Sequence, residues 1–342
     1  MPSTSPLAEN TSNTLAENTL TENPATWTGS SLVSVKQMTP GGLRLLLSVS
    51  EEMKRLVRTS GGDDRLKHRV LSNVFYEAST RTSCSFQSAM LRLGGRVVCV
   101  DAQHSSAKKG ETLSDTMRCL ECYADVSVLR HPVTGSVAEV AFGANAVSKP
   151  VLNAGDGVGE HPSQALLDVF TIEDELRSAG GLAGKTVVLL GDLKHGRTVH
   201  SLAKLVARSG IEGVKFRFCS PQALPMPQEV RDEVAKYGLE MEDFTDLKKA
   251  VDGADVLYVT RVQKERFETE ALYDEVKDLY IVDPTVMAAC PSTMIVLHPL
   301  PRVNEITTAV DKDPRAAYFR QMENGMFVRM ALLALVLGKA SL

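Results

Sequence analysis

The 342-residue sequence lacks an apolar stretch long enough to cross a membrane, and neither sign of charge dominates it. Its longest apolar run is eight residues, 330–337, whereas a membrane span needs about 18 or more. The formal net charge is −4, which favours neither a nucleic-acid partner nor an acidic membrane surface. Any cationic binding site must therefore be local.

Cysteines are few, and no secretory signal sequence precedes them. A reducing, cytoplasmic setting is therefore expected. Cys119 and Cys122 form a Cys-x-x-Cys pair, a spacing that redox and zinc sites use. No second pair supplies the other ligands that a zinc site needs, so we interpret both as helix residues and predict no metal and no cofactor.

The first 35 residues contain no Lys or Arg, and residues 1–30 consist mainly of Ser, Thr, Asn, Glu and Pro. The five-residue string at 7–11 recurs at 15–19. Such a composition buries too little apolar surface to fold alone, and it lacks the arginines of a transit peptide. We interpret residues 1–30 as a disordered linker, which implies that a further domain precedes it.

After the linker, short apolar runs alternate with segments of helical periodicity. This alternation predicts an α/β fold of two domains, each a mostly parallel sheet flanked by helices. The expected domains cover residues 36–165 and 166–310, and helices within 311–342 are expected to return to the first domain. The expected strands are residues 73–76, 97–100, 126–129, 151–153, 187–190, 214–218, 256–259, 280–282 and 295–297.

Of the loops that follow seven of the nine predicted strands, five offer an Arg or Lys close to the strand end. Ligands of open parallel sheets bind beyond the carboxyl ends of the strands, so these loops predict a site for a polyanionic small ligand. The sharpest loop is Ser79-Thr80-Arg81-Thr82, which opens a helix. Free backbone N–H groups and the helix dipole favour an anion there, although a simple capping serine with a surface arginine would give the same pattern.

Other residues of these loops are ambiguous when taken alone. Lys108 and Lys109 read as a solvated charge pair, but they lie in a Ser- and Gly-containing loop that could close over a ligand. His161 directly precedes Pro162, an expected first helical residue, from where its ring could donate to a carbonyl oxygen. His298 is interpreted as structural.

A nucleotide site is a competing interpretation of residues 191–198. They follow a predicted strand and carry the G-x₄-G-x-T frame of a phosphate-binding loop, with Arg197 where that loop requires lysine. Because arginine does not replace that lysine, and because Ser79–Thr82 already offers a phosphate site, we favour the latter.

Several of these motifs together resemble the carbamoyltransferase family. Ser79-Thr80-Arg81-Thr82 followed by Ser85-Phe86, Arg130-His131-Pro132 and His161-Pro162-Ser163-Gln164 resemble its carbamoyl phosphate signature. The strings at 260–266 and 298–302 look like those of the aspartate enzymes, and the cysteine and Ser-Met-Gly loop typical of ornithine enzymes are absent. The strings at 191–197 and 313–320 resemble the domain that ends the multifunctional pyrimidine-synthesis protein of animals and fungi.

The resemblance implies transfer of a carbamoyl group from carbamoyl phosphate to the amino group of L-aspartate, in de novo pyrimidine synthesis. It assigns catalysis to Arg81, Thr82, Lys109, Arg130 and His161. Carbamoyl phosphate would bind Ser79, Thr80, Arg81, Thr82, Ser105, Lys109, Arg130, His161, Gln164, Pro299 and Leu300. Aspartate would bind Lys109, Arg197, Arg261 and Gln263.

The resemblance also implies partners. The family forms homotrimers with shared sites, so Ser105 and Lys109 would come from the neighbouring subunit, and fusion to or association with carbamoyl phosphate synthetase and dihydroorotase-type domains is expected. The alternatives are an ornithine-type carbamoyltransferase and a trimerising scaffold domain without activity. Every expected ligand position carries a competent side chain, which disfavours the scaffold.

Overall fold

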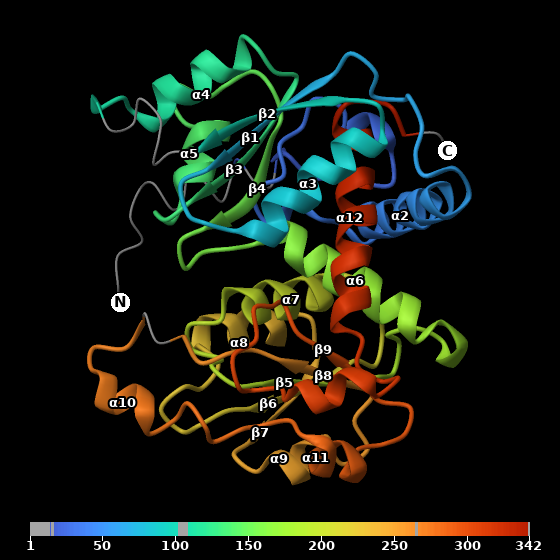
Figure 1. Cartoon of the computed structure of the whole chain (residues 1–342), viewed down its shortest axis with the longest axis vertical. Coiled ribbons are helices and arrows are strands. Elements are labelled where there is room, and N and C mark those ends of the chain that lie inside the picture. Colours follow the sequence, from blue (N-terminus) through green and yellow to red (C-terminus); the bar gives the residue numbers. More distant parts are fainter. Residues whose placement is uncertain (1–13, 15–16, 102–108, 264–265, 341–342) are drawn as a thin grey trace. The chain divides into compact units, whose positions relative to one another are not determined.

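The computed structural model describes residue 14 and residues 17–101, 109–263 and 266–340 (Figure 1). The chain divides into two compact units. Unit 1 comprises Met1–Leu166 and Asn324–Leu342, and unit 2 comprises Leu167–Glu323. The chain passes from one unit to the other within helices α6 (Pro162–Glu175) and α12 (Tyr318–Val336). The C-terminal residues thus return to the first unit, as the sequence predicted.

Unit 1 is built on a four-stranded parallel sheet of order β2-β1-β3-β4. Its helix α3 packs on β1 and β2, while α4 and α5 pack on β3 (Figure 1). Helix α2 precedes the first strand. The bounds are α2 Pro40–Ser60, β1 Val70–Phe75, α3 Thr80–Arg92, β2 Arg96–Asp101, α4 Leu113–Glu121, β3 Val126–His131, α5 Ser136–Phe142 and β4 Val151–Asp156.

The segment between residues 17 and 38 is part of unit 1, which corrects the prediction of a disordered linker for residues 17–30. It contains η1 (Pro24–Thr26) and η2 (Val35–Gln37). Trp27 is fully buried, and its Nε1–H donates to the Thr21 carbonyl at 2.8 Å. The rest of the predicted linker, residues 1–13 and 15–16, lies outside the described residues.

The same segment extends the sheet beyond β4. The Leu32 N–H donates to the Val151 carbonyl at 3.0 Å, and the Asn153 N–H donates to the Leu32 carbonyl at 2.9 Å. The Gly29 N–H donates to the Val336 carbonyl at 2.8 Å, which joins the segment to the end of α12. The segment therefore closes one edge of the sheet, where backbone groups would otherwise be exposed.

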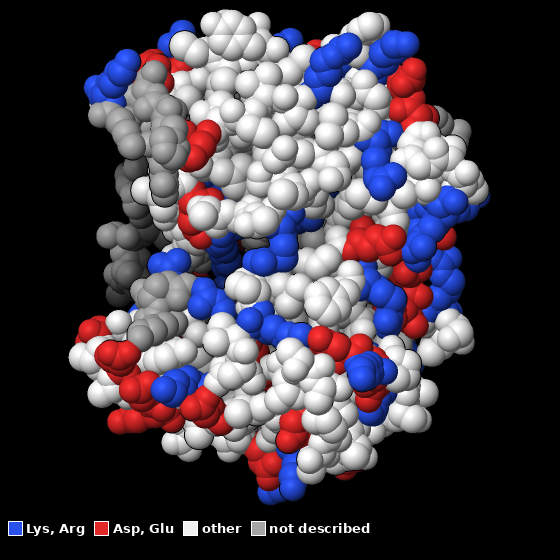
Figure 2. All heavy atoms as spheres, viewed as in Figure 1, with Lys and Arg blue, Asp and Glu red and all other residues white. Residues whose placement is uncertain are grey.

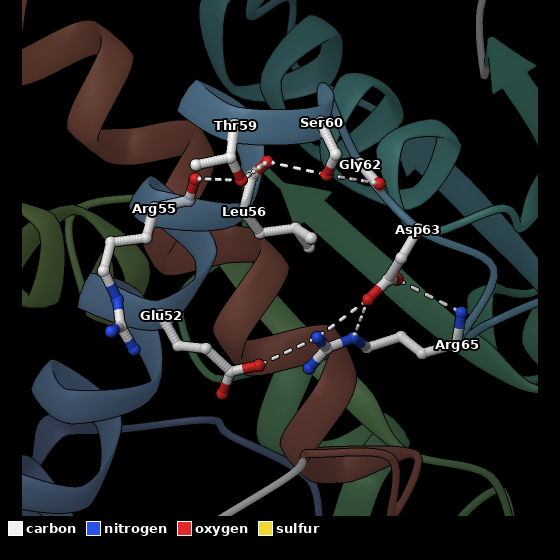
Figure 3. Close-up of polar contacts among 8 residues, drawn as sticks. All are labelled: Glu52, Arg55, Leu56, Thr59, Ser60, Gly62, Asp63 and Arg65. Atoms are coloured by element: carbon white, nitrogen blue, oxygen red, sulfur yellow. Dashed lines mark hydrogen bonds and ion pairs between the residues drawn. The ribbon is translucent and has the colours of Figure 1, made fainter.

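A guanidinium fixes the turn between α2 and β1 (Figure 3). Arg65 Nη2 donates to Glu52 Oε1, and Arg65 Nε donates to Asp63 Oδ2, both at 2.8 Å. The Ser60 hydroxyl donates to the Gly62 carbonyl at 3.0 Å. These contacts hold the end of α2 against the chain that enters β1 (Figure 3).

Unit 2 contains a five-stranded parallel sheet of order β7-β6-β5-β8-β9. A buried apolar cluster around Leu257 and Val296 joins the sheet to α9 and α11. The bounds are η5 Arg177–Ala179, β5 Thr186–Leu190, α7 Arg197–Arg208, β6 Lys215–Cys219, α8 Gln228–Ala235, β7 Glu240–Phe244, α9 Leu247–Val251, β8 Val256–Val259, α10 Glu270–Asp274, α11 Pro284–Ala289, β9 Ile295–Leu297 and η7 Thr308–Lys312.

Two strand predictions in unit 2 were wrong. The predicted strand 280–282 makes only an isolated bridge between Val282 and Ile306. Strand β7 was missed because its sequence, Glu-Met-Glu-Asp-Phe, is polar, as befits an edge strand. Figure 2 shows acidic and basic side chains interspersed on the visible face of unit 2. No helix among the described residues is long and apolar enough to cross a membrane.

Candidate functional site

The β1–α3 loop places Ser79-Thr80-Arg81-Thr82 at the start of a 13-residue helix. Ser79 occupies the N-cap position, yet its side chain makes no capping hydrogen bond. Thr82 is 5% exposed, while Ser79 and Arg81 are half-buried and Thr80 is exposed. The first turn of α3 therefore carries hydroxyl and guanidinium side chains beside its free backbone N–H groups, and the anion site that the sequence indicates there stays a prediction.

Helix α3 is fixed by both polar and apolar contacts. Asn73 Nδ2 donates to Ser83 Oγ at 2.9 Å, which ties the helix to β1. Arg329 Nη1 donates to Ser85 Oγ at 2.9 Å, and its guanidinium lies 5.1 Å from the Phe86 ring centroid. Because Arg329 and Phe86 are buried, the orientation of this helix end is set before any ligand arrives.

Arg130 lies near the carboxyl end of β3, the strand beside β1. It is 7% exposed. Its Nη2 donates to Glu77 Oε1 at 2.5 Å, and its Nη1 donates to the Ala154 carbonyl at 3.2 Å. Glu77 was not singled out in the sequence, because its partner is 53 residues away. Burial lowers the pKa of the next residue, His131, whose Nδ1 accepts from the Val133 N–H.

His161 and Gln164 occupy the start of α6, after β4, and are 4% and 5% exposed. The loop before them is braced from two sides. Asp156 Oδ1 accepts the Glu160 N–H at 2.7 Å. Glu160 in turn accepts the Ser34 hydroxyl at 3.0 Å and the Val35 N–H at 2.8 Å. The residues predicted to bind the phosphate, the carbonyl oxygen and the NH₂ group therefore follow the carboxyl ends of three parallel strands of one sheet, β1, β3 and β4.

Two residues predicted for this site come from the β2–α4 connection. Ser105 lies outside the described residues. Lys109 is described and exposed. Among the described residues, no group of three or more His, Cys, Asp or Glu side chains is arranged to hold a metal ion.

A buried carboxylate organises the predicted aspartate site in unit 2. Asp192, two residues after the end of β5, is 0% exposed. Its Oδ1 accepts the His195 N–H at 3.0 Å, and its Oδ2 lies 3.1 Å from His195 Nδ1. Gln263 Nε2 donates to the His195 carbonyl at 2.9 Å, and the Arg197 N–H donates to the same oxygen at 3.0 Å. Arg197 and Gln263 are therefore held by one loop.

The loop that carries Arg261 runs beside the Asp192 loop. The Thr260 N–H donates to the Leu190 carbonyl at 2.8 Å. At Gly191, a Cβ would lie 2.2 Å from the Thr260 carbonyl oxygen, and φ is +116°, so only glycine permits this approach. Arg197, Arg261 and Gln263 are all half-buried. Two guanidinium groups and one amide thus flank the same pair of strand ends.

Pro299 and Leu300 lie in the loop that follows β9, and both are half-buried. His298 precedes them and is 1% exposed, in keeping with its interpretation as structural. The sequence analysis assigned no role to Asp192 or Glu305. An acidic residue two positions after an apolar strand was the available signal for Asp192.

Both halves of the chain match models of known protein families. Residues 30–174 match the family model "Aspartate/ornithine carbamoyltransferase, carbamoyl-P binding domain". Residues 183–336 match "Aspartate/ornithine carbamoyltransferase, Asp/Orn binding domain". The chain belongs to the aspartate/ornithine carbamoyltransferase family. The nucleotide interpretation of residues 191–198 is thereby set aside, since they lie in the family's Asp/Orn binding domain.

Some relatives are named aspartate carbamoyltransferases, and others are named multifunctional proteins. The multifunctional protein pyr1-3 of Dictyostelium discoideum is 52% identical over 91% of this chain, which spans only 14% of that protein. The aspartate carbamoyltransferase catalytic subunit of Thermococcus gammatolerans is 43% identical over 91% of this chain and 99% of its own length. A Trypanosoma cruzi aspartate transcarbamoylase structure with carbamoyl phosphate and aspartate has a TM-score of 0.85 and 42% identity, covering 92% and 98% of the two chains.

Proposed function

We propose that this chain transfers the carbamoyl group of carbamoyl phosphate to the amino group of L-aspartate, giving N-carbamoyl-L-aspartate and phosphate in de novo pyrimidine synthesis. The observation that carries the choice of acceptor is the pair of half-buried arginines on adjacent loops of unit 2. Two guanidinium forks suit two carboxylates. The cationic side chain of ornithine would be repelled by them, which disfavours the ornithine-type alternative.

The phosphate of carbamoyl phosphate binds Ser79, Thr80, Arg81, Thr82 and Arg130. Its carbonyl oxygen receives donors from Thr82, Arg130 and His161, which stabilise the charge that develops when the tetrahedral intermediate forms. The carbamoyl NH₂ is held by Gln164 and by the carbonyl groups of Pro299 and Leu300. The burial of Thr82, Arg130, His161 and Gln164 supports this assignment, because desolvated donors act in a lower dielectric.

Aspartate binds through its two carboxylates. Arg197 pairs with the α-carboxylate, and Arg261 together with Gln263 holds the β-carboxylate. The amine then attacks the carbamoyl carbon, the C–N bond forms, and the C–O bond to phosphate breaks. Alignment of the two reactants supplies up to roughly 7–11 kcal/mol of the barrier reduction. The departing phosphate takes the proton that the amine loses.

The direct test is a product assay with the purified chain. Carbamoyl phosphate is supplied with aspartate or with ornithine, and N-carbamoyl-aspartate and citrulline are both measured. We expect product with aspartate alone. Product with ornithine alone would support the ornithine-type enzyme, and no product from a folded chain would support the inactive scaffold.

We also propose that the chain acts as a homotrimer whose sites include Ser105 and Lys109 of a neighbouring subunit. Mixing an Arg81→Ala chain with a Lys109→Met chain should then restore activity, because mixed trimers contain one intact kind of site. If subunit exchange is demonstrated and no activity returns, the shared site is wrong.

We further propose that the chain works in the cytoplasm, fused to or associated with carbamoyl phosphate synthetase and dihydroorotase-type domains. The first four curated relatives are multifunctional proteins of which this chain spans 13–16%. All six cysteines are free, as a reducing compartment favours. Antibodies against the chain should detect, in cytoplasmic extract, a species that co-purifies with the other two activities; a lone 37.1 kDa chain would contradict the association.

A further inference from the structure

A buried ionisable pair lies outside the residues assigned to the substrates, at the two ends of the loop that follows β9. His298 is 1% exposed and Glu305 is 5% exposed. His298 Nε2 lies 2.7 Å from Glu305 Oε1. Glu305 Oε2 accepts the N–H groups of Val303 at 3.0 Å and Asn304 at 3.1 Å. The Glu305 carboxylate therefore links the end of this loop to its beginning at His298.

The second ring nitrogen of His298 defines its tautomer. The Leu300 N–H donates to His298 Nδ1 at 2.7 Å, so Nδ1 must be the unprotonated nitrogen. The proton then resides on Nε2 and is donated to Glu305. Burial by itself would raise the pKa of Glu305, but the hydrogen bond from His298 and the backbone donors hold that pKa below its usual range. An ionised Glu305 thus favours the His298 tautomer with its proton on Nε2, and the unprotonated Nδ1 of that tautomer can accept the Leu300 N–H.

This hydrogen bond also sets the direction of a backbone carbonyl. The Pro299 C=O and the Leu300 N–H belong to the same planar peptide group, and in a trans peptide they point in opposite directions. Holding the N–H on the His298 ring therefore aims the Pro299 oxygen away from that ring. Leu300 has φ +53°, a left-handed conformation that leucine seldom adopts. Such a conformation persists where surrounding contacts over-determine it.

The start of the loop has a second brace inside unit 2. The His298 N–H donates to Gln321 Oε1 at 2.9 Å, and Gln321 Nε2 donates to Asp168 Oδ1 at 2.6 Å. The Tyr258 hydroxyl donates to Asp168 Oδ2 at 2.8 Å. All four residues are at most 1% exposed. These hydrogen bonds therefore fix the His298 backbone. The His298 ring is held in turn by its contacts with the Leu300 N–H and the Glu305 carboxylate.

We propose that His298 and Glu305 are positioning residues that orient the Pro299 carbonyl toward the carbamoyl NH₂ of the donor substrate. This rests on the proposed function, which assigns that NH₂ to the carbonyls of Pro299 and Leu300. The pair acts through the backbone and touches no substrate atom. It gives the site a means to select an NH₂ group, because a methyl group in the same place offers no hydrogen to the carbonyl oxygen.

The experiment compares affinity for carbamoyl phosphate with affinity for acetyl phosphate, which keeps the phosphate and the carbonyl but replaces NH₂ with CH₃. His298→Asn keeps an oxygen near the Nδ1 position and so retains an acceptor for the Leu300 N–H. His298→Gln places its amide near the Nε2 position and loses that acceptor. Glu305→Gln removes the carboxylate that selects the tautomer. Glu173→Gln is the control, because Glu173 is another partly buried carboxylate of unit 2 that accepts a backbone N–H, from Leu182.

We expect His298→Gln to lower the carbamoyl-to-acetyl phosphate affinity ratio by about 2- to 10-fold, the change that corresponds to the loss of one neutral hydrogen bond. Glu305→Gln should lower the ratio in the same direction, His298→Asn should lower it less, and Glu173→Gln should leave it unchanged. If His298→Gln does not fold, the comparison of Glu305→Gln with Glu173→Gln carries the same test.

Equal losses for both phosphates would overturn the positioning role, because they would indicate general damage to the site. An unchanged ratio in Glu305→Gln and His298→Gln would overturn it as well. The proposed function is judged separately, by carbamoyl aspartate formation in the unaltered chain. An active chain with an unchanged ratio leaves that function standing and removes only the role of the pair.

Discussion

The two groups of predicted substrate-binding residues differ in how far their side chains are exposed. One group, in unit 1, is predicted to bind carbamoyl phosphate, and the other, in unit 2, is predicted to bind aspartate. In unit 1, four of these residues, Thr82, Arg130, His161 and Gln164, are at most 7% exposed, whereas Ser79, Thr80, Arg81 and Lys109 keep more contact with water. In unit 2, Arg197, Arg261 and Gln263 are half-buried. Buried donors have already lost their water and are held by fixed partners, whereas half-exposed donors lose water and side-chain freedom when the ligand binds.

This difference indicates a division of labour. The four buried residues of unit 1 are organised in advance, as electrostatic stabilisation of a developing charge requires. In unit 2, the Arg197 N–H and the Gln263 side-chain amide both donate to the His195 carbonyl, while the side chains of Arg197, Arg261 and Gln263 keep partial contact with water. We therefore expect changes in unit 1 to affect the chemical step, and changes in unit 2 to affect the affinity for the acceptor.

The largest effect is expected for Arg130→Ala. Loss of a buried donor to the developing oxyanion should lower kcat by about 10²- to 10³-fold. Steady-state kinetics with both substrates saturating measures this. Arg92→Ala is the control, since Arg92 also lies in unit 1 and donates to a backbone carbonyl, that of Gly61, at the opposite end of α3. Similar kcat losses in both variants would contradict the assigned role.

Arg261→Ala should raise the KM for aspartate by roughly 10- to 100-fold, as expected for the loss of a hydrogen bond between charged groups. The affinity for carbamoyl phosphate should stay within about twofold, because sites without shared partners behave independently. Arg231→Ala serves as control, because Arg231 pairs with Asp243 on the edge strand β7. An unchanged aspartate KM would remove Arg261 from the acceptor site.

Trp27→Phe tests whether the N-terminal segment supports the preorganised unit 1. The change removes the donor to the Thr21 carbonyl and leaves a small void, which should lower the free energy of unfolding by about 1–2 kcal/mol. Urea unfolding measures the change. Tyr123→Phe, at a 72% exposed position of unit 1, should alter it by less than about 0.5 kcal/mol. A neutral Trp27→Phe would mean that the segment contributes little.

The smallest effect is expected on acidification, and it should distinguish the two units. Hydrogen bonds from Arg302 and Arg315 hold the pKa values of Asp311 and Asp313 below their usual range, and Glu305 is also lowered. All three belong to unit 2. Because the unfolded chain binds their protons more readily, their stabilisation is complete above the unfolded pKa values and is lost as the pH falls through the folded ones.

Hydrogen exchange between pH 5 and pH 2.5 should therefore show unit 2 losing protection before unit 1. Burial raises the pKa of Glu173, which opposes this trend, but it is one group against three. Asp313→Asn should reduce the acid dependence of unit 2. Simultaneous loss of protection in both units would contradict the expectation.

The sequence predicted the parts of the fold whose signal is local. Apolar runs identified the buried strands, and basic residues at their ends identified Arg81, Arg130, Arg197 and Arg261. Strand β7 was missed because an edge strand needs no apolar residues. The apolar run at 280–282 was overread as a strand, because periodicity does not reveal whether a neighbouring strand is available for pairing.

The errors that matter most concern residues whose partners are distant in the chain. Averaging composition over residues 1–30 hid Leu20 and Trp27, which are buried in a segment whose backbone is bonded to Gln37, to β4 and to the end of α12. Asp192 could be suspected from its position after a strand, whereas the pairing of Glu305 with His298 depends on how the loop between them folds. Pairings of this kind can be identified only in the folded structure.

Unit 2 is an insertion: the chain leaves unit 1 within α6 and re-enters it within α12. During synthesis, the sheet of unit 2 is complete in sequence before the ribosome has added the last residues of unit 1. The N-terminal segment must then wait for Val336, to which Gly29 is bonded, before its own packing is finished. The N-terminal segment of unit 1 is made before unit 2, yet it is among the last parts of unit 1 to reach its final state, and the inserted unit can mature while its host is still open.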